Sequence, residues 1–345
     1  MEKLKSLRSQ MNIEPALIFA AMSMSFLLTS QPQFQYWARC IEIGQEKGFN
    51  DSMCERSEIP DDDEFNKEIQ KDISEMRIYI QIANSLPNII SAPLLGIWAD
   101  RSGRKIPLIF SICGFCIYAL LYIVATLTYR HINVYIWFFI SETIWGLSGG
   151  SCGLIGTMFA MIIDETRKTP NSGNLAVPFR IVLGAALQNF GGFAGNIVIT
   201  MLSDLNSRYL ICAILQCIFI FLTLSYVVLF SHETHHPNRI IETAYETGKV
   251  SVDSTSQNSK IPSFTSRYFS EIWTSIIEVL FRKRRGWVRF CIITSLGLSV
   301  VELIVLDINY IYLYIKRPHF DWSDRTFSLF MTLKGLCAAT GMLLG

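Results

Sequence analysis

Charged side chains are scarce in this chain. Lysine and arginine together number 30 and aspartate and glutamate 29, which is 17% of 345 residues. The net charge of +1 leaves no basic excess of the kind that nucleic-acid binding requires. The chain also lacks a nucleophile with an adjacent base and a cluster of metal ligands. We therefore expect no enzyme, no metal site, no resident cofactor and no nucleic-acid partner.

Two motifs imitate metal or redox sites but are incomplete. His232-Glu233-Thr234-His235-His236 has the H-E-x-x-H spacing of zinc proteases, yet Pro237 follows at once and the polar stretch after it is too short for a catalytic domain. Cys113 and Cys116 have C-x-x-C spacing inside an apolar run, without a second pair. Buried thiols are the better interpretation of these two cysteines.

Long apolar runs, by contrast, are abundant. Apolar residues make up 50% of the chain, and about eight runs reach the ~20 residues that a membrane-spanning helix needs. The runs are 13–37, 78–98, 106–128, 134–163, 177–201, 209–230, 287–314 and 327–345. Residues 1–12 lack the apolar core of a removable signal peptide, so the first run is expected to direct insertion. The sequence predicts an all-α, multi-pass protein of the lipid bilayer.

Basic residues predict which side faces the cytoplasm. Three of them precede the first run, and the cluster 282–285 precedes the seventh, on the same side if the runs alternate. The opposite side receives residues 39–77, which contain the acidic stretch 61–64. Because cytoplasmic loops are enriched in Lys and Arg, we expect a cytoplasmic N-terminus.

The loop 39–77 carries two expected modifications on the opposite side. Asn50-Asp51-Ser52 is a sequon for N-glycosylation at Asn50. Of nine cysteines, only Cys40 and Cys54 lie on or near this oxidising side, so a local disulfide between them is a candidate.

A short charged turn separates the second and third apolar runs. It reads Gly96-Ile97-Trp98-Ala99-Asp100-Arg101-Ser102-Gly103-Arg104-Lys105. Gly96 and Gly103 permit close backbone approach, and Asp100 can bond to helix N-terminal amides or to a basic residue. The pattern G-x-x-x-D-R-x-G-R-K resembles the loop between helices two and three of the major facilitator superfamily. That resemblance implies two six-helix halves around a central substrate site, and a loop that repacks as the halves move.

Shorter matches run along nearly the whole chain. They are Glu14-Pro15, the stretch 48–52, Phe179-Arg180, Glu233-Thr234, Leu313-Tyr314 and Trp322. Together they resemble the family of the proton-coupled folate transporter and its haem-carrier relatives, solute carrier family 46. Departures accompany the matches: Glu142 stands where that family usually has an Arg, and Asp321 where Cys54 would find its disulfide partner. The resemblance therefore implies a shared scaffold more than folate as the substrate.

The polar stretch in the middle of the chain suggests three parts. Residues 1–230 are expected to form a complete N-terminal six-helix bundle. Residues 231–286, which are rich in Ser and Thr, are expected to form a cytoplasmic linker. Residues 287–345 would then be the first two helices of a C-terminal bundle truncated by four helices, through an incomplete gene model or a splice form.

Polar groups inside the apolar runs are candidates for a substrate or proton path, because ionisable groups at membrane depth are costly and usually line water-filled cavities. The candidates are Asp307, Asn309, Glu302, Glu142, Lys334, Gln33 and Gln35. Structural pairing, or an interfacial position, is the alternative for each. We favour Asp307 as the proton carrier, because Asn309 and neighbouring tyrosines keep its part of the helix polar and aromatic.

Glycines recur in the fourth and fifth runs and predict close helix packing rather than gating. They are Gly146, Gly149, Gly150, Gly153, Gly156, Gly184, Gly191, Gly192 and Gly195.

These patterns predict secondary transport of an organic solute, expected to be anionic, by alternating access. Protons are a candidate coupling ion. The alternative function is that of a transport-inactive membrane scaffold or regulator derived from a transporter. The membrane would be the plasma membrane or an endolysosomal one, and the sequence assigns no oligomeric state.

Overall fold

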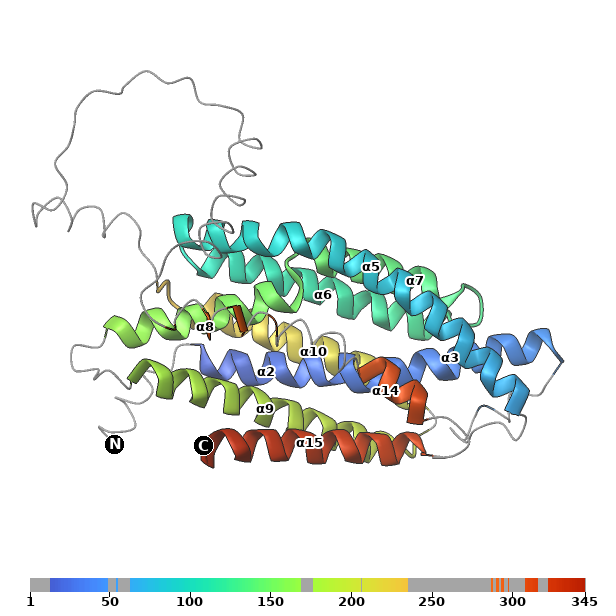
Figure 1. Cartoon of the computed structure of the whole chain (residues 1–345). Coiled ribbons are helices and arrows are strands. Elements are labelled where there is room, and N and C mark those ends of the chain that lie inside the picture. The colour runs from blue at the N-terminus through green and yellow to red at the C-terminus, as the bar shows by residue number, and fades with distance from the viewer. Residues whose placement is uncertain are drawn as a thin grey trace, which may run out of the picture. The chain divides into compact units, whose positions relative to one another are not determined.

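The computed structural model describes residues 13–48, 54, 63–168, 176–205, 207–234, 308–315 and 322–344, and six isolated residues between 287 and 297. The chain divides into two units, residues 1–235 with 308–345, and residues 236–307. The second unit contains the six isolated residues, five of which have helical backbone. Every helix labelled in Figure 1 belongs to the first unit.

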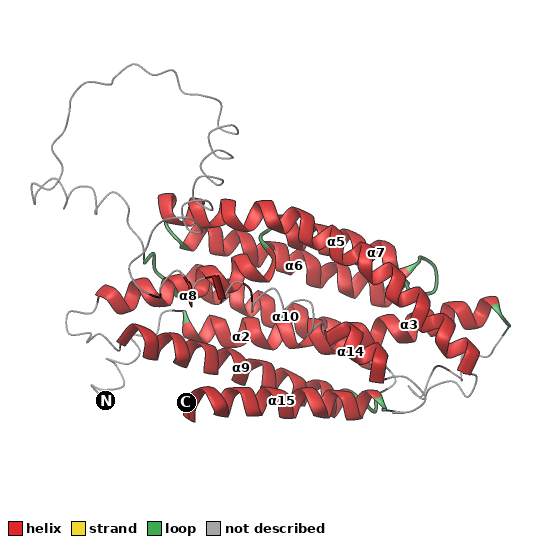
Figure 2. Cartoon of the chain, in the orientation of Figure 1, coloured by secondary structure: helices red, strands yellow, loops and turns green. Residues whose placement is uncertain are grey.

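The described part of the first unit is helical throughout (Figures 1 and 2). Five stretches of helix there are long and apolar enough to cross a membrane, so the all-helical membrane prediction is confirmed, while the count of eight spans stays a prediction. The elements are α2 (Glu14–Ser25), η1 (Phe26–Ser30), α3 (Gln31–Glu46), α5 (Asp63–Ser102), α6 (Lys105–Thr128), α7 (Val134–Leu147), α8 (Gly150–Lys168), α9 (Ala176–Leu202), α10 (Arg208–Leu229), α14 (Ile308–Ile315) and α15 (Asp324–Leu344).

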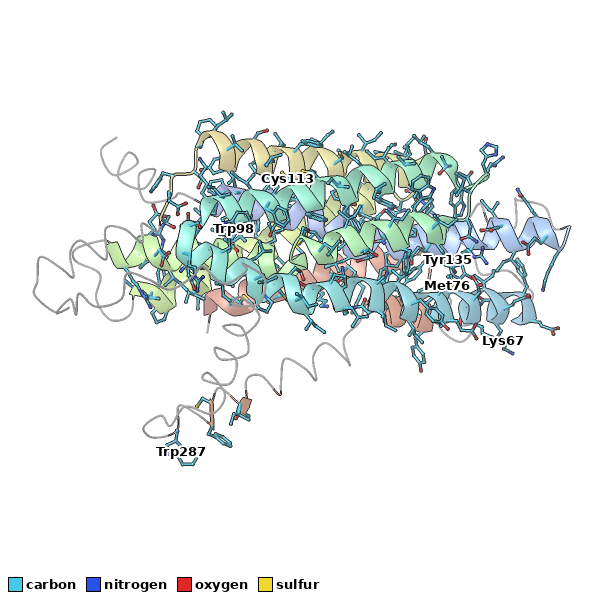
Figure 3. The ribbon with its side chains drawn as sticks, turned by 90° about the horizontal axis from the view of Figure 1, so that it is seen from above. Lys67, Met76, Trp98, Cys113, Tyr135 and Trp287 are labelled. Atoms are coloured by element: carbon cyan, nitrogen blue, oxygen red, sulfur yellow. A yellow bond between two sulfur atoms is a disulfide. The ribbon has the colours of Figure 1, made fainter. Side chains whose placement is uncertain are left out.

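The bundle has two ends that carry different bonds. The motif loop, residues 96–105, lies where α5 passes into α6, and we call this the motif-loop end. Helix α3, which carries Cys40 of the Cys40–Cys54 disulfide, extends to the other end, which we call the disulfide end. Figure 3 shows Lys67, Met76 and Trp98 in order along α5, which runs from the disulfide end to the motif-loop end.

The first helix is longer than predicted and changes its winding. Segments α2, η1 and α3 follow one another without a gap to Glu46, so the helix continues beyond the predicted apolar run 13–37. The π-helical turn η1 stands just before Pro32, which has no N–H to donate to the carbonyl of Leu28. Beyond the turn, this helix contacts a new set of neighbours.

Most of the predicted loop 39–77 is helix as well. Helix α3 continues through Arg39, and α5 already begins at Asp63. Arg39 donates to Asp72 at 2.8 Å, pairs with Glu42 at 2.6 Å and lies over the ring of Tyr135. Burial opposes the charge, but the bonds to Asp72 and Glu42 raise the pKa of Arg39 above its ordinary value. Arg39 and Asp72, two of the charged residues of this region, thus pair between α3 and α5.

The predicted fourth span, 134–163, is broken near its middle. Helix α7 ends at Leu147 and α8 begins at Gly150. Gly149 and Gly150 have φ angles of +91° and +55°, which side-chain-bearing residues rarely adopt. These two glycines therefore turn the chain. They also pack closely, as predicted, because a Cβ on Gly149 would lie 2.2 Å from Leu95 and one on Gly150 would lie 2.9 Å from Asn88.

Other glycines do pack closely. A Cβ on Gly146 would lie 2.3 Å from the carbonyl oxygen of Asn84 on α5, and one on Gly191 would lie 2.6 Å from that of Ile18 on α2. Gly153, Gly184 and Gly195 are similarly crowded, whereas Gly156 and Gly192 have nothing within 4 Å. The packing prediction is confirmed for the crowded positions and wrong for these last two.

The apolar core lies where α2, α6, α8 and α10 meet. Helix α15 packs along α9 (Figure 1). Segments far apart in the sequence therefore form one wall of the bundle.

Candidate functional site

The motif loop is held by a carboxylate that lies far from it in the sequence. Glu233, which follows α10, accepts hydrogen bonds from the backbone N–H of Arg104 at 2.8 Å and of Lys105 at 3.0 Å. A carboxylate at the first turn of α6 satisfies orphan amides and complements the helix dipole. Gly103 has a φ of +100°, and a Cβ there would lie 2.6 Å from Oε2 of Glu233. Glycine is therefore required at 103 for conformation and for space.

The basic residues of the loop have specific partners. Arg104 pairs with Asp100 at 3.2 Å and with Asp164 of α8. Lys105 donates through Nζ to the carbonyls of Val228 at 3.0 Å and Ser231 at 2.7 Å. Asp100 thus bonds to a basic residue, one of its two predicted roles, while the helix N-terminal amides bond to Glu233.

Gly96 and Arg101 are the two remaining motif positions. Gly96 has open space where a Cβ would stand, so the predicted close approach at this residue is wrong. Arg101 is exposed at the end of α5.

A second charged cluster at the motif-loop end joins three helices. Arg180 of α9 pairs with Glu14 of α2 at 2.7 Å and with Glu165 of α8 at 3.4 Å, and the side chain of Glu14 is only 2% exposed. His232 approaches Glu165 at 3.7 Å. Two residues of the zinc-like motif, His232 and Glu233, therefore have different protein partners, and in the described part of the chain no three metal-ligating residues cluster.

Glu142 of α7 is buried within the bundle, with its side chain 10% exposed. Asn84 donates to it at 2.8 Å, and the hydroxyl of Tyr118 stands between Glu142, at 3.3 Å, and Gln31, at 2.7 Å. The guanidinium of Arg77 approaches Glu142 to 3.9 Å. The sequence predicts Arg77 in the loop on the other side of the membrane, and that prediction is wrong because α5 carries it into the bundle.

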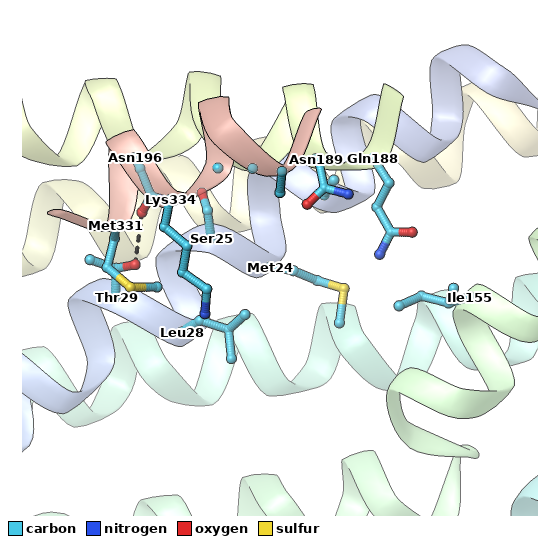
Figure 4. Close-up of a pocket in the computed structure, with 14 residues that line it drawn as sticks. Met24, Ser25, Leu28, Thr29, Ile155, Gln188, Asn189, Asn196, Met331 and Lys334 are labelled. Carbon is cyan, nitrogen blue, oxygen red and sulfur yellow. Dashed lines mark hydrogen bonds between the residues drawn. The ribbon is translucent and has the colours of Figure 1, made fainter. Parts of the chain in front are cut away.

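A cavity of about 270 Å³ opens between α2, η1, α8, α9 and α15 (Figure 4). Its walls are mainly apolar and include Met24, Leu28, Ile155 and Met331. The polar lining residues are Ser25, Thr29, Gln188, Asn189, Asn196 and Lys334. Thr29 donates to Asn196 at 2.7 Å. Lys334 is the one charged residue among those that line the cavity. Figure 4 shows the Lys334 side chain extending from α15 toward Leu28.

Of the candidate side chains that the structure describes, Lys334 alone lines this cavity. Gln33 and Gln35 are both buried elsewhere, and Gln33 donates to Oγ of Ser328 at 2.9 Å. Asn309 lies in α14, although its side chain is not among those described. Asp307, Glu302 and Asn50 lie outside the described residues. Cys40 and Cys54 are joined by a disulfide bond.

The amides of the cavity were missed from the sequence. Asn189, Gly192 and Asn196 recur at intervals of three and four on α9, which places them on one helical face. That polar stripe within an apolar run was the available signal. The search for ionisable residues passed over it because amides carry no charge.

A protein family and several known proteins match this chain in sequence. A family model described as the Major Facilitator Superfamily matches residues 64–345. The lysosomal proton-coupled steroid conjugate and bile acid symporter SLC46A3 of Rattus norvegicus is 26% identical over 203 residues, which are 58% of this chain and 40% of that protein. The Homo sapiens protein of the same name is 28% identical over 105 residues, 30% of this chain and 23% of that protein.

A solved structure also aligns, over 96% of this chain. It is an in meso crystal structure of the POT family transporter PepTSo, with 12% identity, a TM-score of 0.36 and 56% of that chain covered. This chain thus spans less than two thirds of each of these proteins.

Proposed function

Because the chain belongs to the major facilitator superfamily, we propose that it carries an organic anion across a membrane by alternating access. It is a multi-pass membrane protein. The superfamily and the names of its relatives place it among transporters rather than enzymes.

The observation that carries this proposal is the cavity with its single lysine. Apolar side chains such as Met24, Leu28 and Met331 suit the body of an amphipathic molecule, and the ammonium of Lys334 suits a carboxylate or sulfate on it. Gln188 and Asn189 supply donors that would orient the same group. The relatives are named as transporters of steroid conjugates and bile acids, which supports this class of substrate for the present chain.

The position of the cavity also fits such a role. Its walls come from α2, α8 and α9, within the first six spans, and from α15, which follows the polar stretch in the sequence. In the superfamily, substrate sites lie between two halves that rock against each other. We propose residues 1–230 as the N-terminal bundle, 231–286 as a linker and 287–345 as part of the second half.

Proton coupling is part of the proposal, since the relatives are named proton-coupled symporters. Asp307 remains our preferred carrier, with Glu302 and Glu142 as the next candidates. The contacts of Glu142 with Asn84, Tyr118 and Arg77 support a structural role for that carboxylate as well. Asp307→Asn should abolish pH-driven accumulation and leave substrate exchange largely intact. Full pH dependence in this variant would move the assignment to Glu302 or Glu142.

The proposed orientation places the motif loop in the cytoplasm and the disulfide end on the opposite side. A disulfide is stable on the oxidising side of a membrane, and the Cys40–Cys54 bond supports this arrangement. We propose an endolysosomal membrane in preference to the plasma membrane, because the relatives are named lysosomal.

The experiment is a binding measurement with a radiolabelled sulfated steroid on the purified full chain. Lys334→Ala removes the charged partner, and we expect affinity to fall about tenfold or more, the usual effect of losing a charge-assisted hydrogen bond. Lys334→Arg should retain most of the affinity. Lys71→Ala is the matched control, because Lys71 is an exposed lysine on α5 far from the cavity residues in sequence. Equal binding by Lys334→Ala and the unaltered chain would refute the site.

The alternative function, a transport-inactive scaffold or regulator, makes a different prediction. Such a protein has no need of a ligand, so the unaltered chain and every variant would bind the labelled steroid as weakly as Lys334→Ala does. Accumulation in proteoliposomes would be absent at every pH gradient.

A further inference from the structure

A buried carboxylate joins three helices at the disulfide end. Asp324 is the first residue of α15, and its side chain is 4% exposed. Its carboxylate accepts hydrogen bonds from Arg208 at 2.9 Å, from the hydroxyl of Tyr209 at 3.0 Å and from the hydroxyl of Tyr312 at 2.8 Å. Arg208 and Tyr209 belong to α10 and Tyr312 to α14. We call these four residues the Asp324 latch.

Neighbouring contacts reinforce the latch from the first helix. The Gln33 amide of α3 donates to the carbonyl of Asp324 at 3.2 Å and to Oγ of Ser328 at 2.9 Å. The ring of Tyr312 packs edge-on against Tyr36 of α3 and against Phe327 of α15. Helices α3 and α10 therefore contact α14 and α15 through polar and aromatic side chains that cluster around Asp324.

Contacts between the same segments change character along α15. At Thr332 the contact to α9 is a hydroxyl pair with Thr200 at 3.4 Å. At Gly335 the backbone packs against Phe193 of α9. Beside these lie Met331 and Lys334, which line the cavity. Small and apolar surfaces of this kind can slide over each other, whereas an ion pair with several hydrogen bonds is either made or broken.

We propose that the Asp324 latch is the gate that closes the cavity toward the disulfide end, and that it opens whenever a substrate enters or leaves on that side. The inference rests on the proposed alternating access. Breaking the latch without hydration would leave a carboxylate and a guanidinium buried and unpaired, which is costly. Opening is therefore coupled to the entry of water and of solute. The gate has two discrete states whose populations a substitution shifts.

The test measures access to a reporter cysteine behind the gate. Thr332 is 7% exposed and lies two turns beyond Asp324 on α15, so Thr332→Cys places a thiol between the latch and the cavity. Sealed vesicles that present the disulfide end to the medium are treated with a membrane-impermeant maleimide. The signal is the labelling rate above that of the chain with Thr332 intact, which accounts for the other cysteines.

The latch variants are expected to label faster. Asp324→Asn leaves Arg208 without its counter-ion, and we expect its reporter to react about tenfold faster. Because Asp324→Asn endangers folding, the double variant Tyr209→Phe with Tyr312→Phe gives a second measurement: it removes two hydroxyls and keeps both rings and the ion pair. We expect about a threefold increase for it.

A matched control stands at the same end of the bundle. Arg325 and Asp204 form a pair at 3.3 Å with side chains that are 66% and 71% exposed. Arg325→Gln removes this pair, one residue from the latch, and should leave the labelling rate unchanged. Equal labelling of the tyrosine double variant and the unaltered latch, or equally fast labelling of Arg325→Gln, would overturn the gate.

This measurement separates the gate from the proposed function. Labelling requires no transported solute, so a chain that fails to bind the sulfated steroid but shows the expected rates supports the latch and refutes only the substrate assignment. A chain that binds the steroid and whose latch variants label like the unaltered chain refutes the gate alone.

Discussion

The two ends of the bundle are held together by different bonds between different partners. At the motif-loop end, ion pairs and a carboxylate cap connect α2, α5, α6, α8, α9 and the residues just after α10: Asp100 with Arg104, Arg104 with Asp164, Glu233 with α6, and Arg180 with Glu14. At the disulfide end, a covalent bond closes one loop, and Asp324 connects α10 with α14 and α15.

The difference suggests a division of labour. The described contacts at the motif-loop end mostly fix the first six spans among themselves, and α15 reaches that end through a contact between the amide of Asn189 and the sulfur of Met342. Polar closure between α15 and the earlier spans is concentrated at the disulfide end. The motif-loop end therefore holds the earlier helices to one another, while the disulfide end determines whether α15 stays attached to them.

The largest effect on stability is expected at the motif-loop end. Glu14→Ala removes the partner that lies 2.7 Å from the largely buried Arg180 and should cost about 3–5 kcal/mol of the free energy of unfolding. The measurement is chemical unfolding of the purified protein in detergent. Asp204→Ala, which removes an exposed partner of Arg325, should cost less than ~1 kcal/mol. Similar losses in the two variants would contradict the importance of the buried pair.

The disulfide should contribute slightly less. Cys40 and Cys54 are 14 positions apart, and closing a loop of about 15 residues is worth about 3 kcal/mol in the chain-entropy model. Cys40→Ser should lower the free energy of unfolding by about this amount, and a reductant should lower that of the unaltered chain but not of the variant. Cys337→Ser, at an exposed free thiol, is the control. No response to reductant would show that the bond contributes little.

The carboxylate cap on α6 is expected to have a smaller effect. Glu233→Ala removes the acceptor for two backbone N–H groups and should cost about 1–2 kcal/mol. Glu233→Gln keeps one acceptor oxygen and should recover about half of that loss. The ordering Ala below Gln below Glu in unfolding midpoint is the test. If Gln were as harmful as Ala, the negative charge rather than the hydrogen bonds would dominate.

Asp100→Ala should separate stability from transport. The Asp100 side chain is 67% exposed, so the loss of its pair with Arg104 should cost less than ~1 kcal/mol. We nevertheless expect slower transport, because the loop has to repack when the bundle changes state. Yield of folded protein and initial uptake rate are compared in one preparation. Equal falls in both would reduce the motif loop to a structural role.

Asn50→Gln should leave stability unchanged and settle which end faces the secretory lumen. If the disulfide end is lumenal, glycosidase treatment should lower the mass of the unaltered chain and not that of the variant. Labelling of the α3–α5 connection from the cytoplasmic side would reverse the proposed orientation.

The sequence predicted the helices where hydropathy is informative. The predicted runs from 106 and from 209 agree with α6 and α10 to within a few residues. It failed where one residue's environment depends on another far away in the chain. Arg77 looked like a loop residue because its neighbour Glu142 could not be paired with it from sequence alone. Hydropathy is summed over single residues, so it carries no information on such partners.

The same limit applies to the candidate site. Lys334 stood out as a charge in an apolar run, and it lines the cavity. Asp324 was missed because it directly precedes an apolar run, where an acidic residue is an ordinary helix start. Its burial follows from Arg208 and Tyr312, which come from other helices.

The π-turn at Phe26–Ser30 gives the first helix a one-residue offset in register. A π-turn holds one residue more than an α-turn, so every later side chain is rotated by about 100° from where an unbroken α-helix would place it. Before the turn, Ser23 bonds to the carbonyl of Gln216 on α10; after it, Gln33 reaches Ser328 on α15. Deleting a single residue from this turn would leave the composition almost unchanged and direct Gln33 elsewhere. A one-residue gap at this turn in an alignment with homologues therefore means that the later side chains of the helix contact different residues. An alignment without that gap would assign Gln33 to the wrong face of the helix.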